Sequence, residues 1–78
     1  MSRLTEYKEV FSKTFCTAEE SVEEMKYRET EGWSSIGHMI LMTEIEAVFS
    51  INLTTQDIMD FHSYKKGIEI LRKYQIEI

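Results

Sequence analysis

Apolar residues recur at steps of three and four positions near the start of the chain, the spacing that lines one face of a helix. This pattern predicts a helix over about 3–15. Its inward face is expected to consist of Leu4, Tyr7, Val10, Phe11 and Phe15.

The next stretch, residues 17–34, is mostly polar and acidic, so we expect a long loop there. Thr17 followed by Glu20 matches a helix-capping pattern, which predicts a short helical turn within this loop. Met25 and Tyr27 are expected to pin the loop to the core. A loop this long in so small a domain indicates a functional segment or one held by its own contacts.

A second helix is predicted over about 35–49 and is expected to end in the segment 50–52. Ser34 is its expected N-cap residue, with the hydroxyl oxygen accepting a hydrogen bond from a backbone N–H one turn inward. At about 100° per residue, the helix divides into two apolar faces. One is expected to be core and consists of Met39, Met42, Ile45 and Phe49, flanked by Leu41 and Val48.

The opposite face of this second helix is unusually apolar for a surface. It is expected to form a partner-docking patch; scattered surface apolar residues are the alternative. The face consists of Ile36, Ile40, Thr43 and Ala47, with Glu44 nearby.

Two further helices complete the pattern. Residues 54–57 read Thr-Thr-Gln-Asp, a capping box that opens a short helix over about 55–61. Ser63 is the expected cap of a fourth helix over about 64–74, in which Gly67 is expected to permit a close helix contact. The inward residues of the fourth helix are expected to be Ile68, Leu71 and Tyr74.

Three main helices, one short helix and a long first loop predict an all-α four-helix bundle. The 78 residues make a single domain over 1–78, small enough to bury only about 60–65 % of its unfolded surface. The first residues lack a signal-peptide core, and no apolar run approaches the ~18 residues that span a membrane. A cytoplasmic protein that does not enter a membrane is therefore expected.

The formal net charge is −5, which argues against nucleic-acid binding because phosphates require Lys and Arg. The charge either favours basic partners through electrostatic steering or simply maintains solubility. Cys16, the only cysteine, excludes an intramolecular disulfide and is expected to fill a helix end as a small hydrophobic group. The clustered acids are Glu19, Glu20, Glu23, Glu24, Glu29 and Glu31.

The sequence shows no residue group that would run a reaction unaided. His38 and His62 have no second ligand at metal-binding spacing, and the chain has neither a glycine-rich phosphate loop nor a nucleophile elbow. We therefore predict no catalytic and no metal-binding residue. His38 is expected to be half-buried and His62 to lie at a helix junction.

Residues 32–39 read Gly-Trp-Ser-Ser-Ile-Gly-His-Met. They resemble the start of the second helix in stand-alone acyl carrier proteins, which carry Trp-Asp-Ser-Leu/Ile-Gly-His-Met there. The resemblance covers about residues 25–74. It continues through 43–49 (Thr-Glu-Ile-Glu-Ala-Val-Phe), 53–58 (Leu-Thr-Thr-Gln-Asp-Ile) and 63–68 (Ser-Tyr-Lys-Lys-Gly-Ile), and Met25-Lys26-Tyr27 occupies a familiar place in the loop.

The resemblance implies a non-catalytic carrier. In that family the serine before Leu/Ile receives 4′-phosphopantetheine from coenzyme A, which by alignment assigns Ser35 as the attachment site. The implied partners are a phosphopantetheinyl transferase with its own magnesium ion, an acyl-loading ligase, and an acyl-using synthase or transferase. The arm would hold acyl or aminoacyl groups as thioesters for fatty acid or secondary metabolite biosynthesis, on a carrier that is expected to be a monomer.

The chemistry of a helix start agrees with the assignment of Ser35 as the attachment site. A serine in the first turn of a helix is exposed, and the unpaired N–H groups and helix dipole there favour an anionic phosphodiester. No base is at hand to activate the hydroxyl, as expected where a separate enzyme supplies catalysis. The alternative is an ordinary helix-start serine.

Ser34 departs from the family pattern, which has Asp at this position. As N-caps the two residues are nearly equivalent, but in the family the aspartate helps to engage the transferase and its metal. Ser34 is also expected to belong to the docking patch. The missing aspartate supports an alternative function: an unmodified carrier fold that serves only as an interaction module. A small enzyme has little support.

Two side-chain roles stay open. Met39 and Met42 are flexible core fillers or the lining of a pocket for a short acyl chain. Trp33 is expected to clamp the loop onto the second helix, with a partner contact as the alternative.

Overall fold

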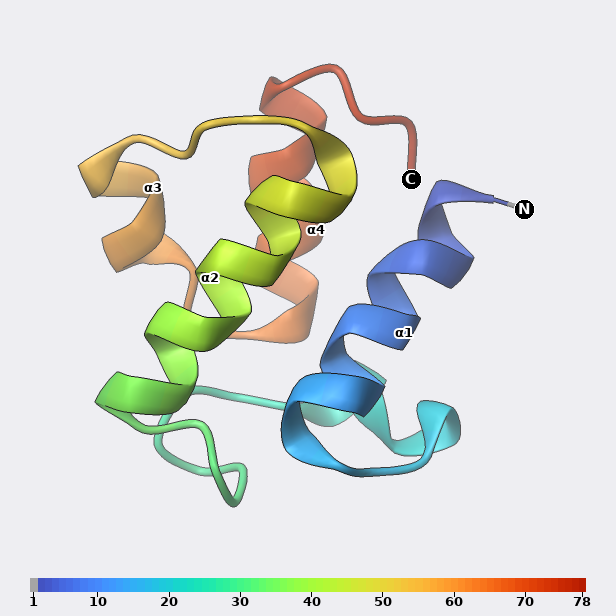
Figure 1. Cartoon of the computed structure of the whole chain (residues 1–78), viewed down its shortest axis with the longest axis vertical. Helices are drawn as coiled ribbons and strands as arrows, with labels where there is room; N and C mark the ends of the chain where they lie inside the picture. The colour runs from blue at the N-terminus through green and yellow to red at the C-terminus, as the bar shows by residue number, and fades with distance from the viewer. Residues whose placement is uncertain (1) are drawn as a thin grey trace.

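Four α-helices and one 3₁₀ helix make up the computed structural model, which describes residues 2–78 (Figure 1). None of these helices has the length and apolar character of a bilayer span. The described residues contain no strand, only one isolated bridge between Lys26 and Ser63, so the predicted all-α class is confirmed. The elements are α1 (Arg3–Phe15), the 3₁₀ helix η1 (Glu19–Glu24), α2 (Ser35–Phe49), α3 (Thr55–Asp60) and α4 (Tyr64–Lys73).

Serine and threonine caps begin three of the α-helices, because a side-chain oxygen there accepts from a backbone N–H that the helix leaves unpaired. Ser2 accepts from the N–H of Thr5 at the start of α1. Ser63 accepts from the N–H of Lys66 at the start of α4, as the sequence predicts. Helix α2 ends at Ser50, which adopts a left-handed conformation with φ 54°.

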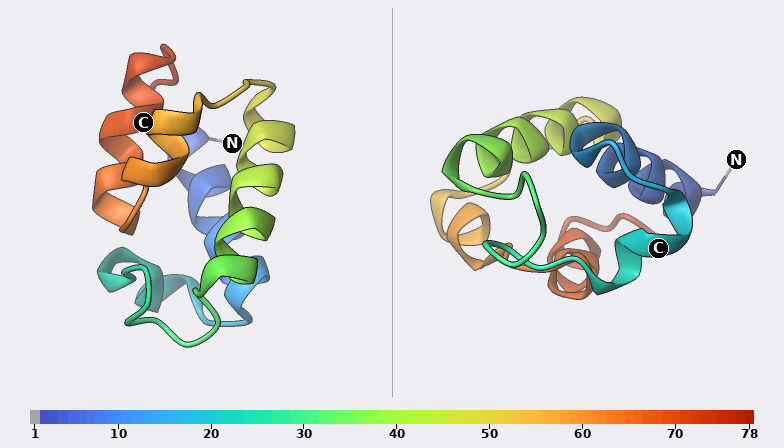
Figure 2. Two further views of the ribbon diagram at one scale, coloured as in Figure 1. Left: turned by 90° about the vertical axis from the view of Figure 1, so that its left-hand side faces the viewer. Right: turned by 90° about the horizontal axis from the view of Figure 1, so that it is seen from below.

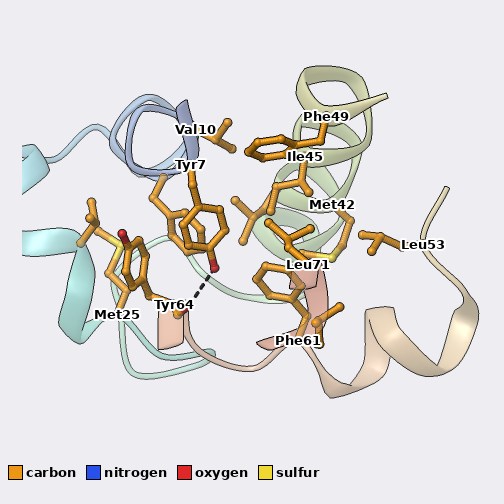
Figure 3. Close-up of a cluster of buried hydrophobic side chains, with 14 of the residues drawn as sticks. Tyr7, Val10, Met25, Met42, Ile45, Phe49, Leu53, Phe61, Tyr64 and Leu71 are labelled. Atoms are coloured by element: carbon orange, nitrogen blue, oxygen red, sulfur yellow. Dashed lines mark hydrogen bonds between the residues drawn. The ribbon is translucent and has the colours of Figure 1, made fainter. Parts of the chain in front are cut away.

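Packed aromatic rings occupy the centre of the bundle, where α1 meets α2 and α4 (Figure 3). Phe11 is fully buried, and the rings of Tyr7 and Tyr64 meet it at centroid distances of 4.9 and 5.1 Å. Leu4, predicted to face inward, is instead 38 % exposed in the first turn of α1. The buried apolar set is Tyr7, Val10, Phe11, Val22, Met25, Trp33, Leu41, Met42, Ile45, Phe49, Leu53, Phe61, Tyr64, Ile70, Leu71 and Ile76.

Gly67 permits the close helix contact that the sequence predicts. A Cβ atom at this position would lie 2.1 Å from the hydroxyl oxygen of Tyr7 and 2.3 Å from Cζ of Phe61. Both distances are too short for any side chain, so α4 approaches α1 through a bare backbone. Helix α4 ends at Lys73 rather than at the predicted 74. Leu71 is buried as expected, whereas Ile68 and the C-cap residue Tyr74 are half-buried.

A buried carboxylate joins α3 to the end of α4. Thr54 caps α3 by accepting from the N–H of Asp57, as expected. The reciprocal bond of a capping box is missing, because the N–H of Thr54 donates to the hydroxyl of Tyr74 instead. The Asp57 carboxylate accepts from Lys73 and Tyr74, both at 2.6 Å. These bonds hold the pKa of Asp57 below its usual value and, conversely, raise the pKa of Lys73.

Two predictions for the turn after α1 are wrong. The short helical turn exists as η1, but its N-cap is Ala18 and no side chain caps it. Thr17 closes α1 instead, since its N–H and carbonyl both bond to Ser12. Cys16 adopts a left-handed conformation, with φ 52°, at the C-cap of α1. That conformation leaves the cysteine exposed rather than filling the helix end.

Candidate functional site

Ser35 is the first residue of α2 and is exposed. The start of α2 lies at the end of the bundle opposite the start of α1 and the C-terminus, where the long loop returns to the helices (Figures 1 and 2). The hydroxyl is therefore open to a macromolecule that approaches this end. Ser34, the preceding residue, is exposed as well.

Ser34 is the N-cap residue of α2, but the predicted side-chain cap is absent. The Ser34 hydroxyl makes no capping bond, while its carbonyl accepts from the N–H of His38 at 2.7 Å. The first turn of α2 also contains no acidic side chain. Its leading N–H groups and the positive end of the helix dipole consequently face Ser35 with no side-chain partner from the cap, an environment that favours an anion.

Trp33 clamps the loop against α2, as predicted. Its indole is 1 % exposed, stacks on Phe15 and donates from Nε1 to Nδ1 of His38 at 2.9 Å. The other His38 nitrogen, Nε2, lies 2.8 Å from the carbonyl oxygen of Ile58. Since a carbonyl only accepts, Nε2 donates. The half-buried His38 therefore joins the loop, α2 and α3, which leaves neither ring nitrogen free to act on Ser35.

A pair of glycines lets the loop approach the first turn of α2. Gly32 adopts φ +89°, a conformation that favours glycine. A Cβ atom on Gly37 would lie 1.9 Å from the carbonyl oxygen of Gly32, so only a bare backbone fits at this contact. The glycines of the 32–39 block thus set how close the loop lies to Ser35.

The hydroxyl of Tyr27 lies 3.5 Å from that of Ser35. The half-buried Tyr27 and the buried Met25 pin the loop to the core, as predicted. Sequence analysis did not predict the hydroxyl contact, because no pattern links a loop residue to a helix start eight positions later. The next residue, Arg28, adopts a left-handed φ of 69° and donates its N–H to the carbonyl of Trp33.

The outer face of α2 is exposed along its length, as the sequence predicts for the docking patch. Ile36 is 75 % exposed and Ile40 is 50 % exposed. Thr43, Glu44 and Ala47 are exposed on the same helix. Among the residues that the structure describes, few other large apolar side chains are so open to solvent. Whether partners dock here remains a prediction.

Met39 contradicts the sequence analysis. Predicted as core, it is 56 % exposed, whereas Met42 is buried. The inward arc of α2 begins at Gly37, which is buried against the loop, and Met39 lies outside that arc. The two methionines therefore do not line a common pocket, and Met39 extends the apolar surface beside Ser35.

A groove of about 490 Å³ lies between α1 and α2. Its lining mixes apolar and acidic side chains from both helices. The apolar ones are Val10, Ile40 and Val48, and the acidic ones are Glu6, Glu9 and Glu44. The docking patch on α2 thus continues toward α1 through Ile40 and Glu44.

No family model, no curated protein and no solved structure matches this chain. In residues 2–78, no group of three or more His, Cys, Asp and Glu side chains is arranged to hold a metal ion. His62 is exposed at the junction of α3 and α4, as predicted. Any assignment of function consequently rests on the residues themselves.

Proposed function

We propose that this chain is an acyl carrier protein that holds acyl or aminoacyl groups on 4′-phosphopantetheine attached to Ser35. The main support is one observation: Ser35 stands exposed at the start of α2, inside the 32–39 block that resembles the attachment motif of stand-alone carriers. The order of three longer helices, a short third helix and a long first loop is compatible with the carrier fold that the resemblance implies.

In the proposed modification, Ser35 Oγ attacks the phosphorus of coenzyme A that bears the pantetheine. A new O–P bond forms, the pyrophosphate P–O bond breaks, and adenosine 3′,5′-bisphosphate leaves. The serine proton passes to a base on the transferase, because both nitrogens of His38, the nearest histidine in sequence, are already hydrogen-bonded. The uncapped start of α2 accommodates the negative charge of the product.

The thiol at the end of the arm then bears a thioester, and partner enzymes dock on the outer face of α2. Exposed apolar residues beside an attachment point fit this role, because a partner that covers them removes apolar surface from water. Tethering raises the effective concentration of the substrate at the docked enzyme and requires no catalysis by the carrier. The apolar residues of this surface are Ile36, Met39 and Ile40.

The test is the intact mass of the protein after incubation with coenzyme A, magnesium and a promiscuous phosphopantetheinyl transferase. Wild type is expected to gain one phosphopantetheinyl group and Ser35→Ala none. Ser34→Ala is the matched control and is expected to gain the group, because the Ser34 hydroxyl caps nothing. A folded wild type without added mass would contradict the proposal.

A second function, a carrier fold that acts only as an interaction module, is favoured by Ser34 in place of aspartate. This alternative keeps the docking patch and loses the arm. It predicts no added mass with any transferase, together with a partner that binds Ser35→Ala and wild type equally well.

A further inference from the structure

The hydroxyl groups of Tyr27 and Ser35 face each other but lie too far apart for a well-formed hydrogen bond. The distance between Tyr27 Oη and Ser35 Oγ is 3.5 Å, whereas a well-formed O–H···O hydrogen bond spans about 2.7–2.8 Å. The two hydroxyls therefore make only a long contact. An oxygen atom bonded to a phosphorus on Ser35 Oγ would be able to enter the space beside the phenol.

Four contacts fix the position of Tyr27. Its N–H donates to the carbonyl of His62 at 2.8 Å. Its ring meets His38 edge-on at a centroid distance of 5.2 Å and Trp33 at 6.4 Å. The neighbouring Arg28 donates its N–H to the carbonyl of Trp33 at 2.9 Å. The ring is thus held by the same cluster that clamps the loop, and its hydroxyl is directed at Ser35.

The groups beside the Tyr27 phenol favour a negative charge at this place. The Ser35 hydroxyl and the positive charge of the neighbouring Arg28 side chain both lower the pKa of Tyr27. Both groups therefore favour negative charge beside the phenol oxygen. Esterification removes the Ser35 proton, so Oγ then has nothing to donate, and Tyr27 becomes the donor of this pair.

We propose that Tyr27 is a positioning residue for the root of the arm: its hydroxyl donates a hydrogen bond to a non-bridging phosphoryl oxygen on Ser35. This inference rests on the proposed function. A hydrogen bond to an anion is shorter and roughly twice as strong as one between neutral groups. The arm consequently leaves Ser35 in a preferred direction, toward the Tyr27 side of α2.

The test is the ³¹P resonance of the modified protein, followed across alkaline pH. In wild type the resonance is expected to shift as Tyr27 ionises, because a phenolate cannot donate to the phosphate. Tyr27→Phe keeps the ring and removes the donor, so this step is expected to vanish while the intact mass still shows the arm. Tyr64→Phe is the matched control, since Tyr64 Oη is buried and has no partner within residues 2–78; the step is expected to persist.

The outcomes separate this inference from the proposed function. Identical ³¹P profiles in modified wild type and modified Tyr27→Phe overturn the role of Tyr27 and leave the carrier intact. A folded wild type that takes up no phosphopantetheine overturns both. Loss of the alkaline step in Tyr27→Phe alone supports the inference, because a purely structural role for the ring would leave the step in place.

Discussion

Two tyrosine hydroxyls in the core differ in their hydrogen bonding. Tyr7 Oη donates to the carbonyl of Tyr64 at 2.7 Å (Figure 3). Tyr64 Oη is buried and finds no partner among residues 2–78. Burial raises the pKa of Tyr64 to about 12 and that of Tyr7 well above its ordinary value. Both phenols are therefore neutral at physiological pH, and only Tyr64 bears the cost of an unpaired buried group.

Tyr64→Phe is expected to raise the free energy of unfolding by about 1 kcal/mol, because the variant removes a buried hydroxyl that forms no hydrogen bond. Tyr7→Phe is the comparison variant. It is expected to lower the free energy of unfolding by about 1 kcal/mol, because the hydrogen bond from Tyr7 to the carbonyl of Tyr64 is lost. Urea unfolding followed by circular dichroism measures both. A destabilised Tyr64→Phe would show that the hydroxyl has a partner in solution.

Ser34 is the residue at which the 32–39 block departs from the carrier motif that it resembles. Ser34→Asp is expected to raise the free energy of unfolding by about 0.3–1 kcal/mol, since a negative charge would face the uncapped start of α2. The resemblance also predicts faster modification by the transferase. Ser34→Asn is the control, because it supplies a capping oxygen without charge. Equal modification rates for all three proteins would refute a role for the charge.

At the scale of elements, the Asp57 carboxylate joins α3 to the end of α4 through hydrogen bonds from Lys73 and Tyr74. The pKa of Asp57 is lowered by its bonds to Lys73 and Tyr74. Its stabilising contribution is therefore fully present above the unfolded-state pKa of about 3.9. It is lost as the pH falls through the lower folded-state value.

Asp57→Asn is expected to lower the free energy of unfolding by about 1–3 kcal/mol at neutral pH, because two hydrogen bonds to a charged group are lost. The difference from wild type is expected to shrink as the pH falls below about 4. Urea unfolding of both proteins at a series of pH values measures the difference. A difference in the free energy of unfolding that stays constant below about pH 4 would contradict an ionised Asp57 in the folded protein.

The bounds of the two main helices could be predicted closely from the apolar pattern. Periodic apolar residues mark 3–15 and 35–49, and α1 and α2 have those bounds. The short helices were predicted less well. Helix α3 ends at Asp60 rather than 61, and η1 begins without the Thr17 cap. At the start of α3, a bond from the N–H of Thr54 to Tyr74 replaces one bond of the capping box. Before η1, Thr17 bonds to Ser12 in α1 instead of capping η1.

Within the candidate site, the exposure of Ile36, Ile40 and Ser35 followed from helical geometry. The inward arc of α2 could be predicted only in part. Gly37, which carries no apolar side chain, is buried against the carbonyl of Gly32, whereas the apolar Met39 is exposed. The approach of Tyr27 to Ser35 depends on a loop conformation without a periodic signal.

At the scale of the whole molecule, one end of the bundle combines Ser35, the clamped loop and an exposed apolar patch, and the start of α1 and the C-terminus lie at the other end (Figure 2). This arrangement is compatible with the proposal that the attachment site and the docking patch form one surface. The net charge of −5 adds long-range attraction for basic partners, which weakens as salt increases.

Ile36→Gln tests the patch. Ile36 is 75 % exposed, so the free energy of unfolding is expected to change by no more than about 0.5 kcal/mol. The kcat/KM of the transferase for this variant is expected to fall about 5- to 30-fold, as for loss of 1–2 kcal/mol at an interface. Leu4→Gln, near the opposite end, is the control. Unchanged kinetics for Ile36→Gln would remove the residue from the docking surface.

The central claim is that Ser35 is the residue that bears the arm. The most direct measurement is tandem mass spectrometry of peptides from the protein after treatment with transferase and coenzyme A. We expect the entire added mass on Ser35 in wild type and in Ser34→Ala. Added mass on Ser34, or an unmodified peptide from a folded protein and a transferase active on another carrier, would contradict the account.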